Sequence, residues 1–230
     1  MQQISKINNF SEGRLKVIHA TENPELYIME YKKDAPLANG EAINWSAEKA
    51  SIACEVSCIL FERLQKMGVA NHFVKKISEY ELVVSKLHMA PLEVVARNVI
   101  GGGLARRLGL EEGIPIFEPI FEYYYKNLEL GNPFVNSDHI RILDIMSQMH
   151  TAELKEIAFS VNACLTKIFK EVGITLVAVK CEYGLDSNGN VVLADEISPD
   201  SCRLWDGEKR VNLGNSLEGF RLVLKRLSGK

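Results

Sequence analysis

Several features that would place this chain in a special class are missing from its 230 residues. No uninterrupted apolar run approaches the roughly 18 residues that a membrane-spanning helix needs. Residues 1–11 lack an apolar stretch flanked by positive charge, so we expect no signal peptide. Internal repeats and low-complexity tracts are also missing. We therefore expect a soluble, cytoplasmic protein that has no membrane partner.

An excess of charge of either sign is missing too, because the formal net charge is only −3 at pH 7. This balance gives no support for nucleic-acid binding. The five cysteines contain no CxxC pair, and no histidine cluster is available to complete a zinc site. We interpret all five as reduced thiols in a reducing compartment. The length suits one large domain or two small lobes with an ample core.

The first third of the chain has the pattern of a β-rich region with one helix. Ser46 is a predicted N-cap, and the apolar spacing that follows it predicts a helix ending at Gly68. Short runs of extended character, bounded by turn residues, predict strands. These predicted strands are 15–19, 26–31, 73–77 and 82–87.

An extended segment, 91–98, leads into the three glycines 101–103. Such glycines either let the backbone approach a ligand closely or form a flexible turn, and the local sequence leaves both interpretations open. Further along, Thr151 is the predicted cap of the longest helix, whose apolar stripe ends at Gly173.

The predicted elements change character near residues 88–92. In this interpretation residues 1–90 form a β-rich lobe and residues 91–230 form an α+β lobe, so the fold class is α+β. Clefts between such lobes are common ligand sites. We therefore expect a ligand to bind between the two lobes.

The most informative element is a predicted β-hairpin with strands at 177–185 and 191–196. The first strand alternates between an apolar face and a partly charged face. Asn188-Gly189 is the preferred two-residue hairpin turn, because both residues tolerate positive φ. With that turn, Glu182 lies directly opposite Asp195, and their Cβ atoms are roughly 4.5–5.5 Å apart.

Two carboxylates at that separation repel each other unless a cation lies between them or the pKa of one of them is raised. Mg²⁺ prefers one or two carboxylates together with phosphate oxygens and water. Glu182 and Asp195 are therefore candidate ligands of a metal–phosphate site. The alternative is a solvated pair on an exposed face, and a shift of one residue in the register would remove the pair altogether.

Further charged residues surround this pair. Lys180 points to the same face as the first carboxylate, and residues 195–206 contain four acids, one arginine and one tryptophan. Arginine binds carboxylate or phosphate groups through two parallel hydrogen bonds. Arg203 is therefore a candidate for binding such a group, and the alternative is a structural salt bridge to Asp200 or Asp206.

These segments resemble the SAICAR synthetase family in order and spacing over nearly the whole chain. The most specific of them is the run Asp-Glu-Ile-Ser-Pro-Asp at 195–200. The resemblance implies a two-lobed fold related to ATP-grasp and kinase-like architectures, with ATP between the lobes, and it implies a homo-oligomer. The segments that carry it are 91–98, 101–109, 111–113, 136–140, 180–184 and 194–206.

The resemblance also implies a reaction, an ATP-dependent C–N ligation in de novo purine biosynthesis. It joins the carboxylate of carboxyaminoimidazole ribotide to the amine of L-aspartate and releases ADP and phosphate. Because a carboxylate is a poor electrophile, phosphorylation to an acyl phosphate provides a leaving group. Catalysis then consists of positioning and of charge neutralisation by Mg²⁺, lysine and arginine.

Arg106 and Arg107 are available for the carboxylates of aspartate, but we expect a solvated helix face there.

The resemblance assigns roles to individual residues. Those expected to contact the nucleotide are Lys16, Arg14, Met89 and Lys126, together with the two metal ligands Glu182 and Asp195. Those expected to bind the ribotide are Glu93, Arg97, Gly103 and Arg203. The expected catalytic residues are Lys180, Asp200 and Arg203.

The chain departs from the family at several of its functional positions. Arg14 stands where the family has lysine, Gly103 where it has a serine for the substrate phosphate, and Asn132 where an acid usually precedes Pro133. Of the family's Lys-Gly element and paired asparagines, only Lys49 survives. Three alternatives stay open: SAICAR synthetase activity, a ligase or kinase acting on another carboxylate, and a silent nucleotide-binding protein.

Overall fold

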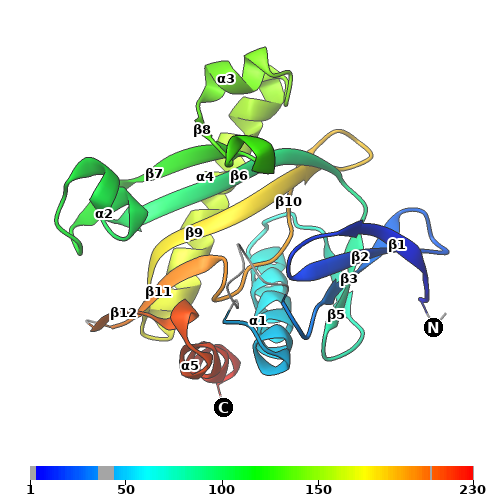
Figure 1. The fold of residues 1–230 in the computed structure, drawn as a ribbon, viewed down its shortest axis with the longest axis horizontal. Helices are drawn as coiled ribbons and strands as arrows, with labels where there is room; N and C mark the ends of the chain where they lie inside the picture. The colour runs from blue at the N-terminus through cyan, green and yellow to red at the C-terminus, as the bar shows by residue number, and fades with distance from the viewer. Residues whose placement is uncertain (1–3, 36–43, 208, 230) are drawn as a thin grey trace.

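The computed structural model describes residues 4–35, 44–207 and 209–229. Residues 1–3, the start of the segment in which we expected no signal peptide, lie outside the described residues. The described chain forms two antiparallel β-sheets with helices packed against them, which agrees with the α+β class (Figure 1). No helix within the described ranges is long and apolar enough to cross a membrane.

The first sheet contains the N-terminal strands in the order β1-β2-β3-β5-β4. The four strands predicted here are confirmed to within two residues at each end. β1 was not predicted, and all of its residues are exposed, so its sequence carries no inside–outside alternation. The bounds are β1 (Lys6–Glu12), β2 (Lys16–Thr21), β3 (Leu26–Tyr31), β4 (Phe73–Lys76) and β5 (Glu81–Ser85).

The second sheet has the order β12-β11-β9-β6-β7-β8, and β10 pairs with β9 beside it. The predicted extended segment 91–98 lies within β6. The bounds are β6 (His88–Val99), β7 (Pro115–Tyr125), β8 (Phe134–Val135), β9 (Ile174–Leu185), β10 (Val191–Ala194), β11 (Cys202–Asp206) and β12 (Lys209–Asn212).

The helices fill the space beside the sheets, and α4 lies against β9 of the second sheet (Figure 1). Ser46 caps α1 by accepting a hydrogen bond from the Lys49 N–H at 3.3 Å, which confirms that prediction. The bounds are α1 (Ala47–Lys66), α2 (Gly103–Leu108), α3 (Ser137–Ile142), α4 (Gln148–Glu171) and α5 (Leu217–Ser228), with 3₁₀ turns η1 (Leu128–Leu130) and η2 (Leu213–Asn215).

The predicted cap of α4 was wrong by one turn. Ser147, rather than Thr151, is the N-cap, and its side chain accepts a hydrogen bond from the His150 N–H at 3.1 Å. Thr151 lies inside the first turn, where its hydroxyl donates to the Ser147 carbonyl at 2.9 Å. In the first turn of α4 only Met149 is apolar, and it is exposed, so the apolar stripe alone placed the start of the helix too late.

One continuous apolar core joins the two sheets. Leu60 and Phe61 of α1, Leu165 and Phe169 of α4, and residues of both sheets belong to the same cluster. All five cysteines are free, and burial raises the pKa of the Cys54 thiol to about 12. Buried thiols of this kind behave as small apolar side chains.

The hairpin between β9 and β10 has a register one residue away from the predicted one. The Gly189 N–H donates to the Asp186 carbonyl at 3.0 Å, and the loop contains three residues rather than two. Gly189 has a φ of +82°, as expected for a type I turn followed by a left-handed residue. Glu182 consequently lies opposite Ala194, and the prediction that it lies opposite Asp195 was wrong.

The left-handed conformation of Gly189 can be tested by substitution. Nothing lies within 4 Å of the position of an added Cβ, so only backbone strain opposes Gly189→Ala. We expect this substitution to lower the free energy of unfolding by about 1 kcal/mol, measured by urea denaturation. Ser187→Ala, an exposed position in the same turn, is the matched control, with an expected change of less than about 0.5 kcal/mol. Equal losses in the two variants would contradict a left-handed Gly189.

Candidate active site

One face of the second sheet gathers many of the residues that the resemblance singled out. Glu93 on β6 lies opposite Glu182 on β9. Arg97 on β6 and Arg203 on β11 both lie opposite Ala178 on β9. Directly opposed residues point to the same face of a sheet, and side chains alternate along each strand. The shared face therefore carries Glu93, Arg97, Lys180, Glu182 and Arg203.

The other face of the same strands is apolar and buried. Val179, Cys181 and Tyr183 of β9 are each at most 3% exposed, and they belong to the core on which α4 packs. This alternation leaves the charged side chains of β9 on the opposite face, as the sequence pattern predicted.

A cavity of about 370 Å³ is lined by residues from both sheets. Much of its wall is apolar, with Phe10, Ile18 and Met29 among the residues from the first sheet. The lining also includes five residues expected at the nucleotide: Lys16, Met89, Lys126, Glu182 and Asp195. Arg14, also expected there, is instead exposed in the turn between β1 and β2 and is not among the lining residues.

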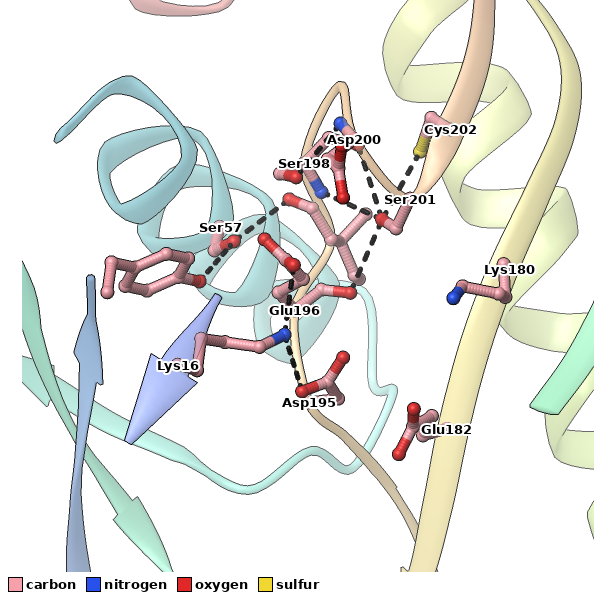
Figure 2. Close-up of polar contacts among 12 residues, drawn as sticks. Lys16, Ser57, Lys180, Glu182, Asp195, Glu196, Ser198, Asp200, Ser201 and Cys202 are labelled. Atoms are coloured by element: carbon pink, nitrogen blue, oxygen red, sulfur yellow. Dashed lines mark hydrogen bonds and ion pairs between the residues drawn. The ribbon is translucent and has the colours of Figure 1, made fainter. Parts of the chain in front are cut away.

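Lysine–carboxylate pairs form the polar end of this cavity. Lys16 reaches from β2 and places its Nζ 2.6 Å from Asp195 Oδ1 and 2.9 Å from Glu196 Oε1 (Figure 2). Lys126, which follows β7, places its Nζ 2.6 Å from Glu182 Oε2. Three carboxylates and two lysines therefore share one partly buried region.

Burial and mutual repulsion shift the pKa values of these groups. Burial, and then the charge of Asp195, raises the pKa of Glu182, although Lys126 opposes the rise. Burial also raises the pKa of Glu196. Burial acts in the same direction on Asp195, but Lys16 and Lys126 outweigh it and lower the Asp195 pKa. Such a cluster binds an added cation more readily than an added anion alone.

Asp195 owes its orientation to an unusual backbone conformation. Its φ is +60°, in the left-handed region that few residues other than glycine adopt. Pairing with β9 ends at Ala194, and the left-handed residue then turns the chain so that the Asp195 carboxylate faces Lys16. Both carboxylates therefore line the cavity although the predicted register was wrong. Glu182 is only 9% exposed, which excludes the alternative of a solvated pair.

A short relay of hydrogen bonds fixes the segment after Asp195. The Tyr31 hydroxyl donates to Ser57 Oγ at 3.0 Å, and Ser57 Oγ donates to the Ile197 carbonyl at 3.1 Å (Figure 2). The relay links β3, α1 and the segment that carries the acids. Because all three residues are buried, the relay restricts this segment from the side of the core.

The donors in this region suit a magnesium ion that also contacts phosphate. Mg²⁺ usually takes one or two protein carboxylates and completes its shell with phosphate oxygens and water, and Glu182 and Asp195 offer such a pair. Glu196 Oε2 is buried without a hydrogen-bond partner among the described residues. Within the described ranges no group of three or more His, Cys, Asp or Glu side chains suited to a metal occurs. The residues present therefore fit a shared metal–phosphate site better than a cage of protein side chains.

Arg203 packs against the glycine segment rather than against its sequence neighbours. A Cβ on Gly102 would lie 2.8 Å from Arg203 Nη1, so the glycine allows the guanidinium to approach the backbone. The ion pair of Arg203 is with Glu112 at 3.9 Å, whereas Asp206 pairs with Arg226 at 2.6 Å. The alternative of a salt bridge between Arg203 and Asp206 is therefore wrong. Gly102, whose φ is +58°, turns the chain and also leaves room for the guanidinium.

The remaining residues predicted for the substrate site are Lys180, Gly103 and Asp200, and they differ in how many contacts hold them. Lys180 Nζ is 2.9 Å from Glu93 Oε1. Gly103 is the first residue of α2, and nothing lies within 4 Å of the position of an added Cβ. Asp200 is exposed, and its backbone N–H donates to Ser198 Oγ at 3.1 Å. Arg203 pairs with Glu112 instead, so the alternative of a salt bridge between Arg203 and Asp200 is wrong.

Sequence reasoning missed a network centred on Glu122 of β7. This side chain is buried, and its Oε2 lies 2.8 Å from Arg97 Nη2 and 3.0 Å from the Tyr124 hydroxyl. Arg107 also pairs with Glu122. Arg106 and Arg107 are both exposed, as expected for a solvated helix face, and Arg107 in addition pairs with the buried Glu122. The signal for this network was a single acid within the aromatic run of β7.

Comparison with known proteins places this arrangement among enzymes. A family model described as SAICAR synthetase matches residues 9–220. The phosphoribosylaminoimidazole-succinocarboxamide synthase of Lysinibacillus sphaericus is 41% identical over 228 residues, covering 95% of this chain and 97% of that protein. The protein of the same name from Bacillus cytotoxicus is 43% identical over 235 residues, covering 98% of each.

Solved structures agree with the sequence relatives. The phosphoribosylaminoimidazole-succinocarboxamide synthase from Ehrlichia chaffeensis has a TM-score of 0.90 at 34% identity, covering 97% of this chain and 99% of that chain. A SAICAR synthetase in complex with ADP has a TM-score of 0.89 at 38% identity, covering 96% and 97%. These structures share the mixed α/β fold of this chain.

Fold, site and relatives together define a class of enzyme. The chain is an ATP-dependent ligase that forms a carbon–nitrogen bond. Within that class it belongs to the SAICAR synthetase family, whose reaction is a step of purine biosynthesis.

The Glu122 network gives a prediction about stability and pH. Glu122→Gln leaves Arg97 without its buried countercharge, so we expect a loss of about 2 kcal/mol in the free energy of unfolding at pH 7. Burial alone would raise the pKa of Glu122, but the two arginines outweigh burial and lower this pKa below 4.5. The unfolded chain therefore takes up the proton first as pH falls, and the wild type loses this stabilisation below about pH 4.5.

Urea denaturation at several pH values measures both effects. The difference between wild type and Glu122→Gln should shrink as the pH drops below about 4.5. Glu118→Gln, on the same strand but exposed, is the control and should change stability by less than about 0.5 kcal/mol at any pH. A Glu122→Gln loss that does not vary with pH would refute the charge-based explanation.

Proposed function

We propose that this enzyme joins carboxyaminoimidazole ribotide to L-aspartate through an acyl phosphate, forming SAICAR, ADP and phosphate. The observation that carries the proposal is the pair of carboxylates, Glu182 and Asp195, held by Lys126 and Lys16 at the polar end of one cavity. A SAICAR synthetase at 38% identity has been solved in complex with ADP, which supports nucleotide binding by this chain, and we assign the nucleotide to this cavity.

The cavity suits a nucleotide because its two ends differ in polarity. In the proposed complex the adenine lies along the apolar wall beside Met89, and the phosphates lie toward Lys16 and Lys126. Glu182 and Asp195 would hold Mg²⁺, which neutralises charge on the transferring phosphoryl group when bound. On binding, both lysines would exchange their carboxylate partners for phosphate oxygens. Arg14, exposed beside the cavity, would contact the nucleotide from outside it.

The polar face of the second sheet suits the ribotide. Arg97, Gly103 and Arg203 would bind its phosphate, and the pair of Lys180 and Glu93 would orient its carboxylate. Asp200, in the turn before β11, would support the pocket. This assignment uses arginines where bidentate contact with phosphate is favourable.

The chemistry then proceeds in two steps. A carboxylate oxygen of the ribotide attacks the γ-phosphorus, and the bond to ADP breaks. The free amine of L-aspartate next adds to the acyl carbon, the C–O bond breaks, phosphate leaves and the amine loses one proton. Lys180 would offset the negative charge that develops on the acyl oxygen.

We further propose that residues 1–90 and 91–230 act as two lobes around the nucleotide, in an architecture related to ATP-grasp enzymes and kinases. The division of strands between two sheets near residues 85–88 supports this boundary.

The side chains of Phe117 and Phe159, exposed at 99% and 55%, support assembly as a homo-oligomer. Five free cysteines support a reducing, cytoplasmic location.

A coupled assay of ADP release tests the proposed function. With ATP and Mg²⁺, we expect sustained ADP release only when carboxyaminoimidazole ribotide and L-aspartate are both present. Release with a different carboxylate would favour the alternative of another substrate, and no release with any carboxylate would favour a silent nucleotide-binding protein.

Glu182→Gln and Asp195→Asn should each reduce turnover at least about 100-fold while the circular dichroism spectrum stays unchanged. Normal turnover in either variant would disprove the metal assignment.

Gly103 offers a second test, aimed at the substrate. Because nothing occupies the space beside it, the family's serine should fit without a clash in Gly103→Ser. A restored hydroxyl that reaches the ribotide phosphate should lower the KM for the ribotide by about fivefold, the worth of one hydrogen bond, with kcat unchanged. Gly103→Ala is the matched control and should leave KM unchanged. If the serine and alanine variants share one KM, Gly103 does not lie at the phosphate.

A further inference from the structure

The proposed metal site depends on a residue whose backbone is intrinsically unfavourable. The φ of +60° at Asp195 costs on the order of 1 kcal/mol for a residue with a side chain unless neighbouring contacts hold it. Sheet pairing ends one residue earlier, at Ala194, so β9 does not hold Asp195 in place. Other contacts must therefore fix this conformation.

His72, which precedes β4 in the first sheet, supplies such contacts. Its ring Nε2 lies 3.0 Å from the Asp195 carbonyl oxygen, and its backbone N–H donates to the Leu193 carbonyl at 2.9 Å. The neighbouring residue Asn71 pairs with Leu193 as an isolated parallel bridge. His72 therefore holds the segment 193–195 at two residues, Leu193 and Asp195.

The His72 ring is itself tightly placed. It is 6% exposed, lines the same cavity as Asp195, and packs edge-on against the Phe61 ring at a centroid distance of 5.3 Å. A carbonyl oxygen only accepts hydrogen bonds, so the ring nitrogen Nε2 that faces the Asp195 carbonyl carries a proton and donates it.

We propose that His72 is a positioning residue for the metal site: its Nε2–H holds the Asp195 carbonyl so that the Asp195 carboxylate lines the cavity that Glu182 also lines. This inference rests on the proposed role of Asp195 as a magnesium ligand. His72 touches neither the metal nor the substrate in this role. It acts through the backbone of the ligand, in the way that outer-shell hydrogen bonds orient metal ligands in general.

A second buried histidine provides a matched control. His19 lies on β2 of the same sheet and is 8% exposed. Its Nε2 lies 2.8 Å from Glu30 Oε2, so its partner is a side chain and not the segment that carries Asp195. Replacing either histidine by leucine removes one partly buried hydrogen bond, but only His72→Leu removes a contact to a proposed metal ligand.

The test measures ADP affinity by calorimetry, once with MgCl₂ and once with EDTA. The ratio of the two dissociation constants reports the contribution of the metal. In His72→Leu we expect this ratio to fall about fivefold, which corresponds to one neutral hydrogen bond of about 1 kcal/mol. The affinity in EDTA should stay within about twofold, since a lost hydrogen bond at Asp195 does not change the contacts of the metal-free nucleotide.

Two further variants sharpen the result. His72→Gln carries an amide N–H that reaches the same carbonyl, so we expect it to retain most of the wild-type ratio. His19→Leu should keep the ratio unchanged. The inference is overturned if His72→Leu keeps the wild-type ratio, if its affinity in EDTA falls as much as in MgCl₂, if glutamine fails where leucine fails, or if His19→Leu lowers the ratio equally.

Asp195→Asn separates this inference from the proposed function. If Asp195→Asn loses the magnesium dependence while His72→Leu keeps it, only the role of His72 is wrong. If Asp195→Asn keeps the wild-type ratio, Asp195 is not a metal ligand, and the inference and the metal assignment of the proposed function both fail.

Discussion

The site depends on an ion pair between residues 180 positions apart in the sequence, Lys16 and Glu196, which Asp195 completes. Buried charges of one sign are costly unless charges of the other sign lie beside them. Lys16 comes from the first sheet and the two acids from the segment after β10, so the charge balance of the cavity requires both parts of the chain to be in place. Lys126 and Glu182 repeat this arrangement at the neighbouring strand.

This balance would let the cavity accept the proposed metal and nucleotide together. A divalent cation and a polyphosphate bring opposite charges, so their joint entry changes the net charge of the region far less than either alone. The lysines can turn to phosphate oxygens as the carboxylates turn to the cation. In the proposed complex, the same groups that stabilise the fold without ligand would become the binding groups.

The sequence alone predicted much of the fold and the identity of the acidic pair, but not the geometry that brings the pair together. The strands of the first sheet follow clear turn signals, and Ser46 follows a strong capping preference. Asn188-Gly189 also favours a two-residue turn, yet Asp186 closes a three-residue loop and shifts the register. A left-handed φ at Asp195 is set by tertiary contacts, and no local pattern reveals it.

Residues that act through distant partners were the hardest to predict. His72 is a lone histidine with no motif around it, and its contact with Asp195 spans 123 positions. Glu122 sits in an aromatic strand, where its pairing with Arg97 depends on the register of β6 and β7. The family resemblance supplied Arg97, and the segment 195–206 already indicated Arg203, whereas only the fold shows which glycine Arg203 approaches.

The most direct test of the central claim is a crystal structure with ADP in which Mn²⁺ replaces Mg²⁺, measured at a wavelength where manganese scatters anomalously. We expect a manganese peak within coordination distance of the Glu182 and Asp195 carboxylates and of phosphate oxygens, with the Lys16 ammonium turned toward phosphate. A manganese peak that touches neither carboxylate, or nucleotide phosphates lying away from this end of the cavity, would contradict it.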